Sequence, residues 1–153
     1  MSVRLLMTAA TAILISALVP PIPAGEKEDA VARDMKLLQG SWTLHSFVAN
    51  GKEAPAETIQ KIKLTIRGDH YLVDFGTQKM ELTFTIDPTK KPKAIDLINV
   101  KDDKKTVTHG IYEISADTLK LCRGTETGQE RPSEFAAKEG SKLAIAIYKR
   151  EKK

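Results

Sequence analysis

Hydrophobicity along this chain alternates with a period of two, in short runs separated by turn residues. Because the side chains of a β-strand point alternately to its two faces, this period is typical of strands that bury one face. The clearest run extends over 79–86, where Met80, Leu82, Phe84 and Ile86 alternate with Lys, Glu and Thr. The runs predict eight strands, which cover 41–49, 61–67, 70–75, 79–86, 94–100, 106–114, 118–123 and 143–147.

The same alternation predicts which residues of the first and last strands face inward. In 41–49 the predicted inward set is Trp42, Leu44, Ser46 and Val48. In the last strand it is Leu143, Ile145 and Ile147. The pair Asn50-Gly51, a strong turn signal, ends the first of these strands.

No helix-length pattern separates the predicted strands, so the sheet is expected to be antiparallel. Strands with one apolar face each bury those faces together in a sandwich or in a closed barrel. Closure removes exposed edges, and eight strands enclose an interior that is either just filled or holds one small ligand. We therefore predict an all-β, eight-stranded antiparallel barrel. The segment 28–38, with apolar residues at helical spacing and Gly40 beyond it, predicts a short N-terminal helix that caps one end.

The N-terminal segment has the pattern of a signal peptide. Arg4 provides a positive start, residues 5–19 carry no charge, and three prolines follow within 20–23. About 15 apolar residues fall short of the roughly 20 that a membrane-spanning helix needs. We expect removal of residues 1–24, which leaves one periplasmic or secreted domain over 25–153 without stable membrane insertion. The alternative is an uncleaved N-terminal membrane anchor.

The charge balance is mildly basic. Arg4 is the only charged side chain of the signal segment, so the net charge falls from +4 to +3 on its removal. Lysines gather at 90–93 and 101–105; we interpret these as solvated loops, with contact to an anionic cell envelope as the alternative. Aromatic residues make up only 5% and are not interleaved with basic ones, so no nucleic-acid partner is predicted. We expect a monomer.

Five short motifs occur in order through the predicted barrel. They are Leu38–Trp42, Pro92–Leu97, Gly110–Glu113, Asp117–Cys122 and Arg131–Phe135. Together they resemble an uncharacterised domain family of planctomycete bacteria, and the resemblance extends over residues 35–150. It implies a lipocalin-like β-barrel and brings no established activity with it.

The segment Gly40-Ser41-Trp42 is also similar to the Gly-x-Trp opening of lipocalins. The tryptophan there closes the barrel floor under a basic residue from the last strand. The resemblance implies that Arg150 or Lys149 takes this position, in a contact worth about 0.5–2 kcal/mol. The other lipocalin motifs are absent, and a single cysteine permits no intrachain disulfide. The structural signature expected from the motifs comprises Gly40, Trp42, Gly110, Tyr112, Cys122, Pro132 and Arg150.

The three histidines do not have the spacing of a metal site on one helix face. His70 follows a predicted turn and is expected at the surface. His45 and His109 lie on strands that a barrel can bring together. We interpret them as surface or hydrogen-bonded side chains, with a shared site as the alternative. No metal ion and no cofactor is predicted.

Catalysis is not predicted. Cys122 alternates with Leu121, so we expect a packed thiol on the opposite face, without the neighbouring base that activates a catalytic cysteine. The chain has no Gly-x-Ser-x-Gly segment, and no nucleophile and base stand at a readable spacing.

Asp96 is an acid within an otherwise apolar strand, and Arg123 ends the 118–123 strand. A charge inside a strand is exposed, paired or hydrogen-bonded. We interpret Asp96 as a carboxylate that braces the barrel, either in an ion pair with Arg123 or bound to the backbone, with a polar anchor at a pocket mouth as the alternative. The longest loop, over residues 124–141, is expected to fold over the barrel with Phe135 packed against it. The candidate ligand-binding residues are His45, Asp96, His109, Arg123 and Arg131.

Two functions are compatible with this pattern. The preferred hypothesis is a non-catalytic, lipocalin-like binding module for a small or apolar ligand. The alternative is a protein or cell-envelope interaction module with a filled barrel and no small ligand. A cavity inside the barrel distinguishes the two.

Overall fold

The computed structural model of this chain describes residues 20–152. This part contains two helices, α1 (Ala24–Leu38) and α2 (Ala56–Ile59). Its strands are β1 (Gly40–Ala49), β2 (Lys52–Glu53), β3 (Lys63–Arg67), β4 (His70–Asp74), β5 (Lys79–Asp87), β6 (Lys93–Lys101), β7 (Lys104–Ile114), β8 (Thr118–Gly124) and β9 (Leu143–Arg150). The predicted signal segment falls largely outside the described residues, so its cleavage stays a prediction. None of the described helices is long and apolar enough to cross a membrane.

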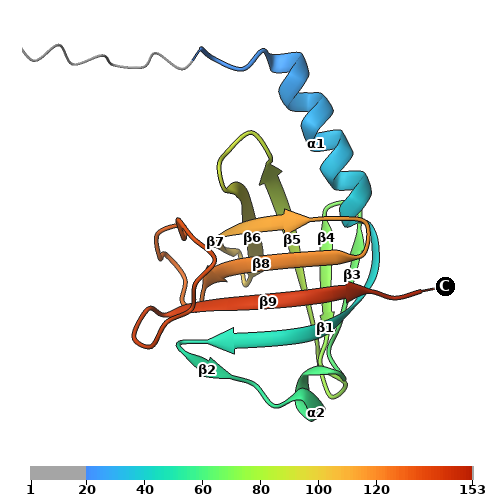
Figure 1. The fold of residues 1–153 in the computed structure, drawn as a ribbon, viewed down its shortest axis with the longest axis vertical. Helices are drawn as coiled ribbons and strands as arrows, with labels where there is room; N and C mark the ends of the chain where they lie inside the picture. Colours follow the sequence, from blue (N-terminus) through green and yellow to red (C-terminus); the bar gives the residue numbers. More distant parts are fainter. Residues whose placement is uncertain (1–19, 153) are drawn as a thin grey trace, which may run out of the picture.

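The strands form a closed antiparallel barrel. From β3 to β9 each strand pairs with its neighbour in sequence, while β1 pairs with β3 on one side and with β9 on the other. The short β2 adds a two-residue extension to β1. The predicted eight-stranded antiparallel barrel with an N-terminal helix is thus confirmed. Figure 1 shows α1 at one end of the barrel and the long loop between β8 and β9 at the other.

Two tight turns contain consecutive residues in the left-handed region. Asn50 and Gly51, with φ of 51° and 79°, link β1 to β2. Asp102 and Asp103, with φ of 51° and 61°, link β6 to β7. Two such residues in succession are typical of the type I′ turn, whose twist matches that of the strands it joins.

The core lies inside the barrel, and several of its side chains in the half next to α1 are fully buried. As predicted for β5, Leu82 and Phe84 are buried, and Met80 and Ile86 pack against the same cluster. The fully buried side chains of this cluster include Leu38, Trp42, Leu64 and Tyr112. The period of two therefore identifies the inner face correctly for β5.

The predicted inner face of β1 is correct only for its first half. The pairing of β1 with β9 shifts between Leu44 and Ser46, which leaves His45 as an extra residue in a β-bulge. A bulge reverses the alternation beyond it. Phe47 therefore faces the interior in place of the predicted Ser46 and Val48.

The predicted strand over 143–147 is present as β9, but its predicted inner face is wrong. Ala144, Ala146 and Tyr148 are the buried, inward residues, and Ile145 and Ile147 are half-buried on the outer side. Ile145 lies opposite Cys122 of β8 and Val48 of β1, which share this outer face. Apolar side chains occupy both faces of β9, so hydrophobicity alone could not indicate the inner one.

Trp42 closes the end of the barrel next to α1. Its Nε1 donates to the carbonyl of Leu38 at 3.0 Å, and the Arg150 guanidinium lies 4.0 Å from the centre of its ring. Arg150 also donates to the carbonyls of Leu37 and Gln39, at the C-terminus of α1. Of the two bases considered from the sequence, Arg150 takes the position over the indole, whereas Lys149 donates to Thr118 Oγ1.

Two ion pairs hold α1 against the barrel wall. The carboxylate of Asp34, only 6% exposed, accepts from Lys93 Nζ and from the Tyr112 hydroxyl, both at 2.7 Å. Near the start of the helix, Lys27 Nζ lies 2.9 Å from Asp87 Oδ2. These side-chain contacts fix the helix to β5, β6 and β7.

Candidate functional site

The half of the barrel interior remote from Trp42 is hollow. A cavity of about 290 Å³ lies there, bounded by the ends of strands that lead toward the long loop. We call this cavity the cup. Phe75 at its mouth is 36% exposed. The barrel therefore combines a filled, helix-capped half with a hollow, open half.

The wall of the cup is mainly apolar. Eleven of its 18 lining residues are aliphatic, Met or Phe: Leu44, Phe47, Ile62, Val73, Phe75, Met80, Leu82, Leu97, Leu121, Ala144 and Ala146. The seven polar ones are Tyr71, Asn99, Thr106, Thr108, Arg123, Thr127 and Tyr148. Such a wall suits a ligand that is mostly apolar and has a small polar part.

Two tyrosines lie where the hollow half meets the filled half. The hydroxyl of Tyr71 donates to that of Tyr148 at 3.4 Å, and the Tyr71 ring packs edge-on against Phe84 with centroids 6.3 Å apart. Burial raises the pKa of Tyr71 well above its ordinary value, and it raises the pKa of Tyr148 as well. Both hydroxyls therefore stay protonated at neutral pH and can donate hydrogen bonds.

Arg123 lines the cup and is not the partner of Asp96, which corrects the pair predicted from the sequence. The two residues lie on opposite faces of the barrel wall. Arg123 Nη1 donates to the carbonyl of Gly124 at 3.0 Å. Gly110 on the neighbouring β7 leaves room for it, because a Cβ there would lie 3.2 Å from Arg123 Cβ and 2.9 Å from the Cys122 carbonyl oxygen.

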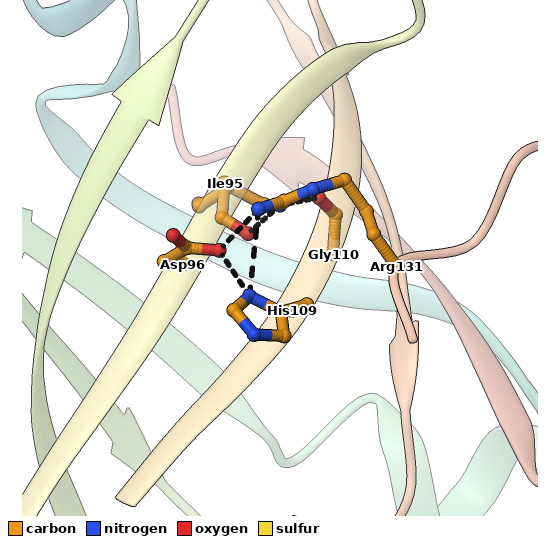
Figure 2. Close-up of polar contacts among 5 residues, drawn as sticks. All are labelled: Ile95, Asp96, His109, Gly110 and Arg131. Atoms are coloured by element: carbon orange, nitrogen blue, oxygen red, sulfur yellow. Dashed lines mark hydrogen bonds and ion pairs between the residues drawn. The ribbon is translucent and has the colours of Figure 1, made fainter. Parts of the chain in front are cut away.

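Asp96, His109 and Arg131 form a second polar cluster, on the outside of the barrel (Figure 2). His109 Nδ1 and Arg131 Nη2 each lie 2.8 Å from Asp96 Oδ1. Arg131 Nη1 donates to the carbonyls of Ile95 and Gly110, at 3.0 and 2.8 Å. The structure thus brings together three of the five candidate residues, and Arg131 takes the role that the sequence suggested for Arg123.

The outer cluster attaches the long loop to β6 and β7 through the hydrogen bonds of Arg131. Burial raises the pKa of Asp96, but the hydrogen bonds and charges of His109 and Arg131 outweigh this effect and leave the pKa below its ordinary value. The carboxylate is therefore ionised at neutral pH and paired within the protein.

An outer groove of about 600 Å³ runs past Asp96 and Arg131 toward Lys90 and Lys91.

Three other residues that the sequence singled out lie outside the lining of the cup: His45, Cys122 and Pro132. His45 is exposed at the bulge and takes no part in the contacts of His109. Cys122 faces outward as predicted; its Sγ lies 3.7 Å from the Ala136 carbonyl oxygen, and burial raises its pKa. Pro132 is buried in the long loop. The Phe135 ring in the same loop lies 4.4 Å from Lys120 Nζ.

Most residues of the cup were not predicted as site residues. Some of them could have been found from the alternation along β6 and β7. It places three polar residues in phase with inward apolar neighbours, and polar residues on an inner face are a sign of a lined cavity: Asn99, Thr106 and Thr108. Tyr148 was missed because the inner face of β9 was predicted in the wrong phase.

Comparisons with protein-family models, curated proteins and solved structures found no match to this chain. The planctomycete-type family stays a prediction from the five motifs. Within residues 20–152, no three His, Cys, Asp or Glu side chains cluster closely enough to hold a metal ion.

Proposed function

We propose that the protein is a non-catalytic binding module that takes a small, mainly apolar ligand into the cup. The proposal depends on one observation, the open cavity of about 290 Å³ inside the barrel. Small-molecule sites are concave, largely apolar and roughly 300–1,000 Å³ in volume, so the cup suits a small ligand. Each Å² of apolar surface that the ligand buries contributes about 25 cal/mol to binding.

The lining of the cup supports binding over catalysis. It includes no His, Cys, Ser, Asp, Glu or Lys. Covalent and acid–base catalysis need a nucleophile or a proton-transfer group with a pKa near the working pH. The hydroxyls in the cup belong to threonines and to two tyrosines whose pKa values burial raises.

The location of this binding module is part of the proposal. The charge and hydropathy pattern of residues 1–24 supports export, and we place the module in the periplasm or outside the cell. A ligand taken from that compartment reaches the cup through the open end of the barrel.

Titration of the full-length chain with N-phenyl-1-naphthylamine, a neutral apolar fluorescent dye, tests the proposal. We expect saturable binding to one site. The variant Ala146→Leu adds volume inside the cup and should weaken binding at least about tenfold, which corresponds to about 1.4 kcal/mol. Ala32→Leu makes the same change on the exposed side of α1 and should leave binding unchanged. Absence of dye binding, or equal binding by both variants, contradicts the proposal.

Contact with the cell envelope is a second candidate function, favoured by the tip of the β6–β7 hairpin. Val100 is 65% exposed there, beside the exposed Lys101, Lys104 and Lys105. An exposed apolar side chain among lysines suits an anionic surface. Charge reversal of the three lysines to Glu should release the protein from isolated envelopes at low salt. Retention that does not change on reversal removes this candidate.

A further inference from the structure

The cup contains one formal charge, which is positive. Arg123 lies on the inner face of β8, opposite Gly110 of β7 and Ala144 of β9. The remaining residues that line the cup are uncharged at neutral pH. A guanidinium stays protonated under all physiological conditions, so this charge is permanent.

Arg123 has few acceptors compared with two other arginines of the barrel. Arg131 donates to two carbonyls and a carboxylate, and Arg150 donates to three carbonyls. Arg123 has one such contact, to the carbonyl of Gly124. Within residues 20–152 it has no carboxylate at ion-pair distance. A guanidinium carries five N–H donors, so most of those of Arg123 are available to a molecule in the cup.

Tyr71 and Tyr148 line the same cavity as this guanidinium. The Arg123 charge acts to lower the pKa of each tyrosine, against the larger upward effect of burial. Because Tyr71 donates to Tyr148, the proton of the Tyr148 hydroxyl is left for another acceptor. A permanent cation and a hydroxyl donor thus line the same mainly apolar cavity.

A cation that faces an apolar cavity is costly unless an anion or hydrogen-bond acceptors compensate it. We propose that the ligand of the cup is an amphiphile whose carboxylate pairs with Arg123 and whose aliphatic chain lies against the apolar wall. Arginine binds carboxylates through two parallel N–H···O bonds, which orient the head group as well as hold it. The inference rests on the proposed function, since it assumes a small ligand in the cup, and adds the chemical class of that ligand.

Three eight-carbon probes whose head groups are anionic, neutral and cationic test the inference: octanoate, 1-octanol and octylammonium. Each is titrated into the full-length protein near neutral pH by isothermal titration calorimetry. Octanoate should bind at least about tenfold more tightly than 1-octanol, because hydrogen bonds to a charged partner are the strong ones. Octylammonium should bind most weakly, because its charge repels that of Arg123.

Variants at Arg123 assign the preference to this side chain. Arg123→Met keeps a long side chain without charge and should make octanoate and 1-octanol bind equally. Arg123→Lys keeps the charge and should retain part of the preference. Arg67→Met removes a guanidinium from the exposed surface of β3 and should leave the preference intact. Retained binding of 1-octanol shows that the cup of each variant is still folded.

The possible results separate this inference from the proposed function. If the wild-type protein binds 1-octanol as tightly as octanoate, the carboxylate inference is wrong and the apolar binding site remains. If Arg123→Met keeps the octanoate preference, Arg123 is not the recognition residue. If no probe binds the wild-type protein, the proposed function fails together with the inference. If Arg123→Met does not fold, the affinities of the wild-type protein for the three probes still test whether the cup prefers a carboxylate.

Discussion

At the scale of single residues, Arg150 has the widest set of contacts at the closed end of the barrel. Its guanidinium lies over the Trp42 ring and donates to the carbonyls of Leu37, Gln39 and Ala116. These acceptors belong to the last turn of α1, the residue that follows it and the β7–β8 turn. A cation near the C-terminus of a helix is also favoured by the helix dipole.

Replacement of Arg150 by Met should therefore destabilise the fold. We expect a loss of about 2 kcal/mol in the free energy of unfolding, from the lost ring contact and the unpaired carbonyls. Urea unfolding followed by circular dichroism measures this loss. The matched change Lys149→Met removes a single exposed contact to Thr118 and should cost less than about 0.5 kcal/mol. Equal effects of the two changes would show that Arg150 has no special role.

The outer cluster of Asp96, His109 and Arg131 shows which features of single residues the sequence predicts and which it does not. Asp96 was identified correctly as an acid that needs a partner, since its strand is otherwise apolar. Its partner was misassigned, because Arg131 belongs to a loop whose path no local pattern indicates. Arg123 follows the alternation of Leu119 and Leu121 and so points inward; this argument was available from the sequence.

At the scale of strands and turns, regular alternation was sufficient where each strand has one apolar face. It identified the inner face of β5, and in β8 it placed Cys122 correctly on the face opposite Leu121. It failed on β1, because the bulge at His45 changes the phase without a local sequence signal. It failed on β9 because Ile145 and Ile147 form part of an outer apolar surface next to Cys122.

The β6–β7 turn offers a stabilising substitution. Asp103 has a φ of 61°, a left-handed conformation that glycine adopts without the steric cost of a Cβ. Asp103→Gly creates the Asp-Gly pair favoured in type I′ turns and should raise the free energy of unfolding by roughly 0.5 kcal/mol. Asp103→Ala removes the same carboxylate but keeps a Cβ, so it should not stabilise the protein. Equal urea midpoints for the two variants would contradict this explanation.

The contact between α1 and β5 predicts a pH dependence. A hydrogen bond from Thr89 Oγ1, together with Lys27, lowers the pKa of Asp87 to about 2 from its ordinary value of 3.8. An acid whose pKa falls on folding stabilises the folded state above its unfolded pKa. This stabilisation is therefore complete above about pH 4 and is lost as the pH falls through about 2.

Asp87→Asn should thus reduce the free energy of unfolding at neutral pH by less than about 1 kcal/mol, because the side chain lies close to solvent. The difference from wild type should disappear as the pH approaches about 2. Urea unfolding across this pH range measures it. Asp29→Asn, at an exposed position of α1 with no ion pair in the described structure, serves as the charge-matched control. A constant difference at all pH values would contradict the prediction.

At the scale of the whole molecule, the barrel is divided into a filled half and a hollow half. The eight-strand count allowed either a filled interior or a ligand cavity, and sequence alone could not decide between them. The decision depends on how side chains of different strands meet, as at the Tyr71–Tyr148 contact between residues 77 positions apart. Such contacts are a property of the closed barrel and not of any one strand.

This division predicts unequal effects of the same truncation in the two halves. Phe84→Ala removes a ring that is 2% exposed within the filled half and should cost about 3–5 kcal/mol. Phe75→Ala at the mouth of the cup, where the side chain is 36% exposed, should cost less than about 1.5 kcal/mol. Urea unfolding of both variants tests the division. Similar losses would indicate that the mouth contributes to the core.

Trp42 is the only tryptophan of the chain, and it is fully buried beneath Arg150, outside the lining of the cup. Its emission maximum depends on water near the indole, which enters only when the helix-capped end loosens. Uptake of a ligand at the opposite end leaves that spectrum in place. Intrinsic fluorescence can therefore report loss of structure separately from occupancy of the cup, without a label.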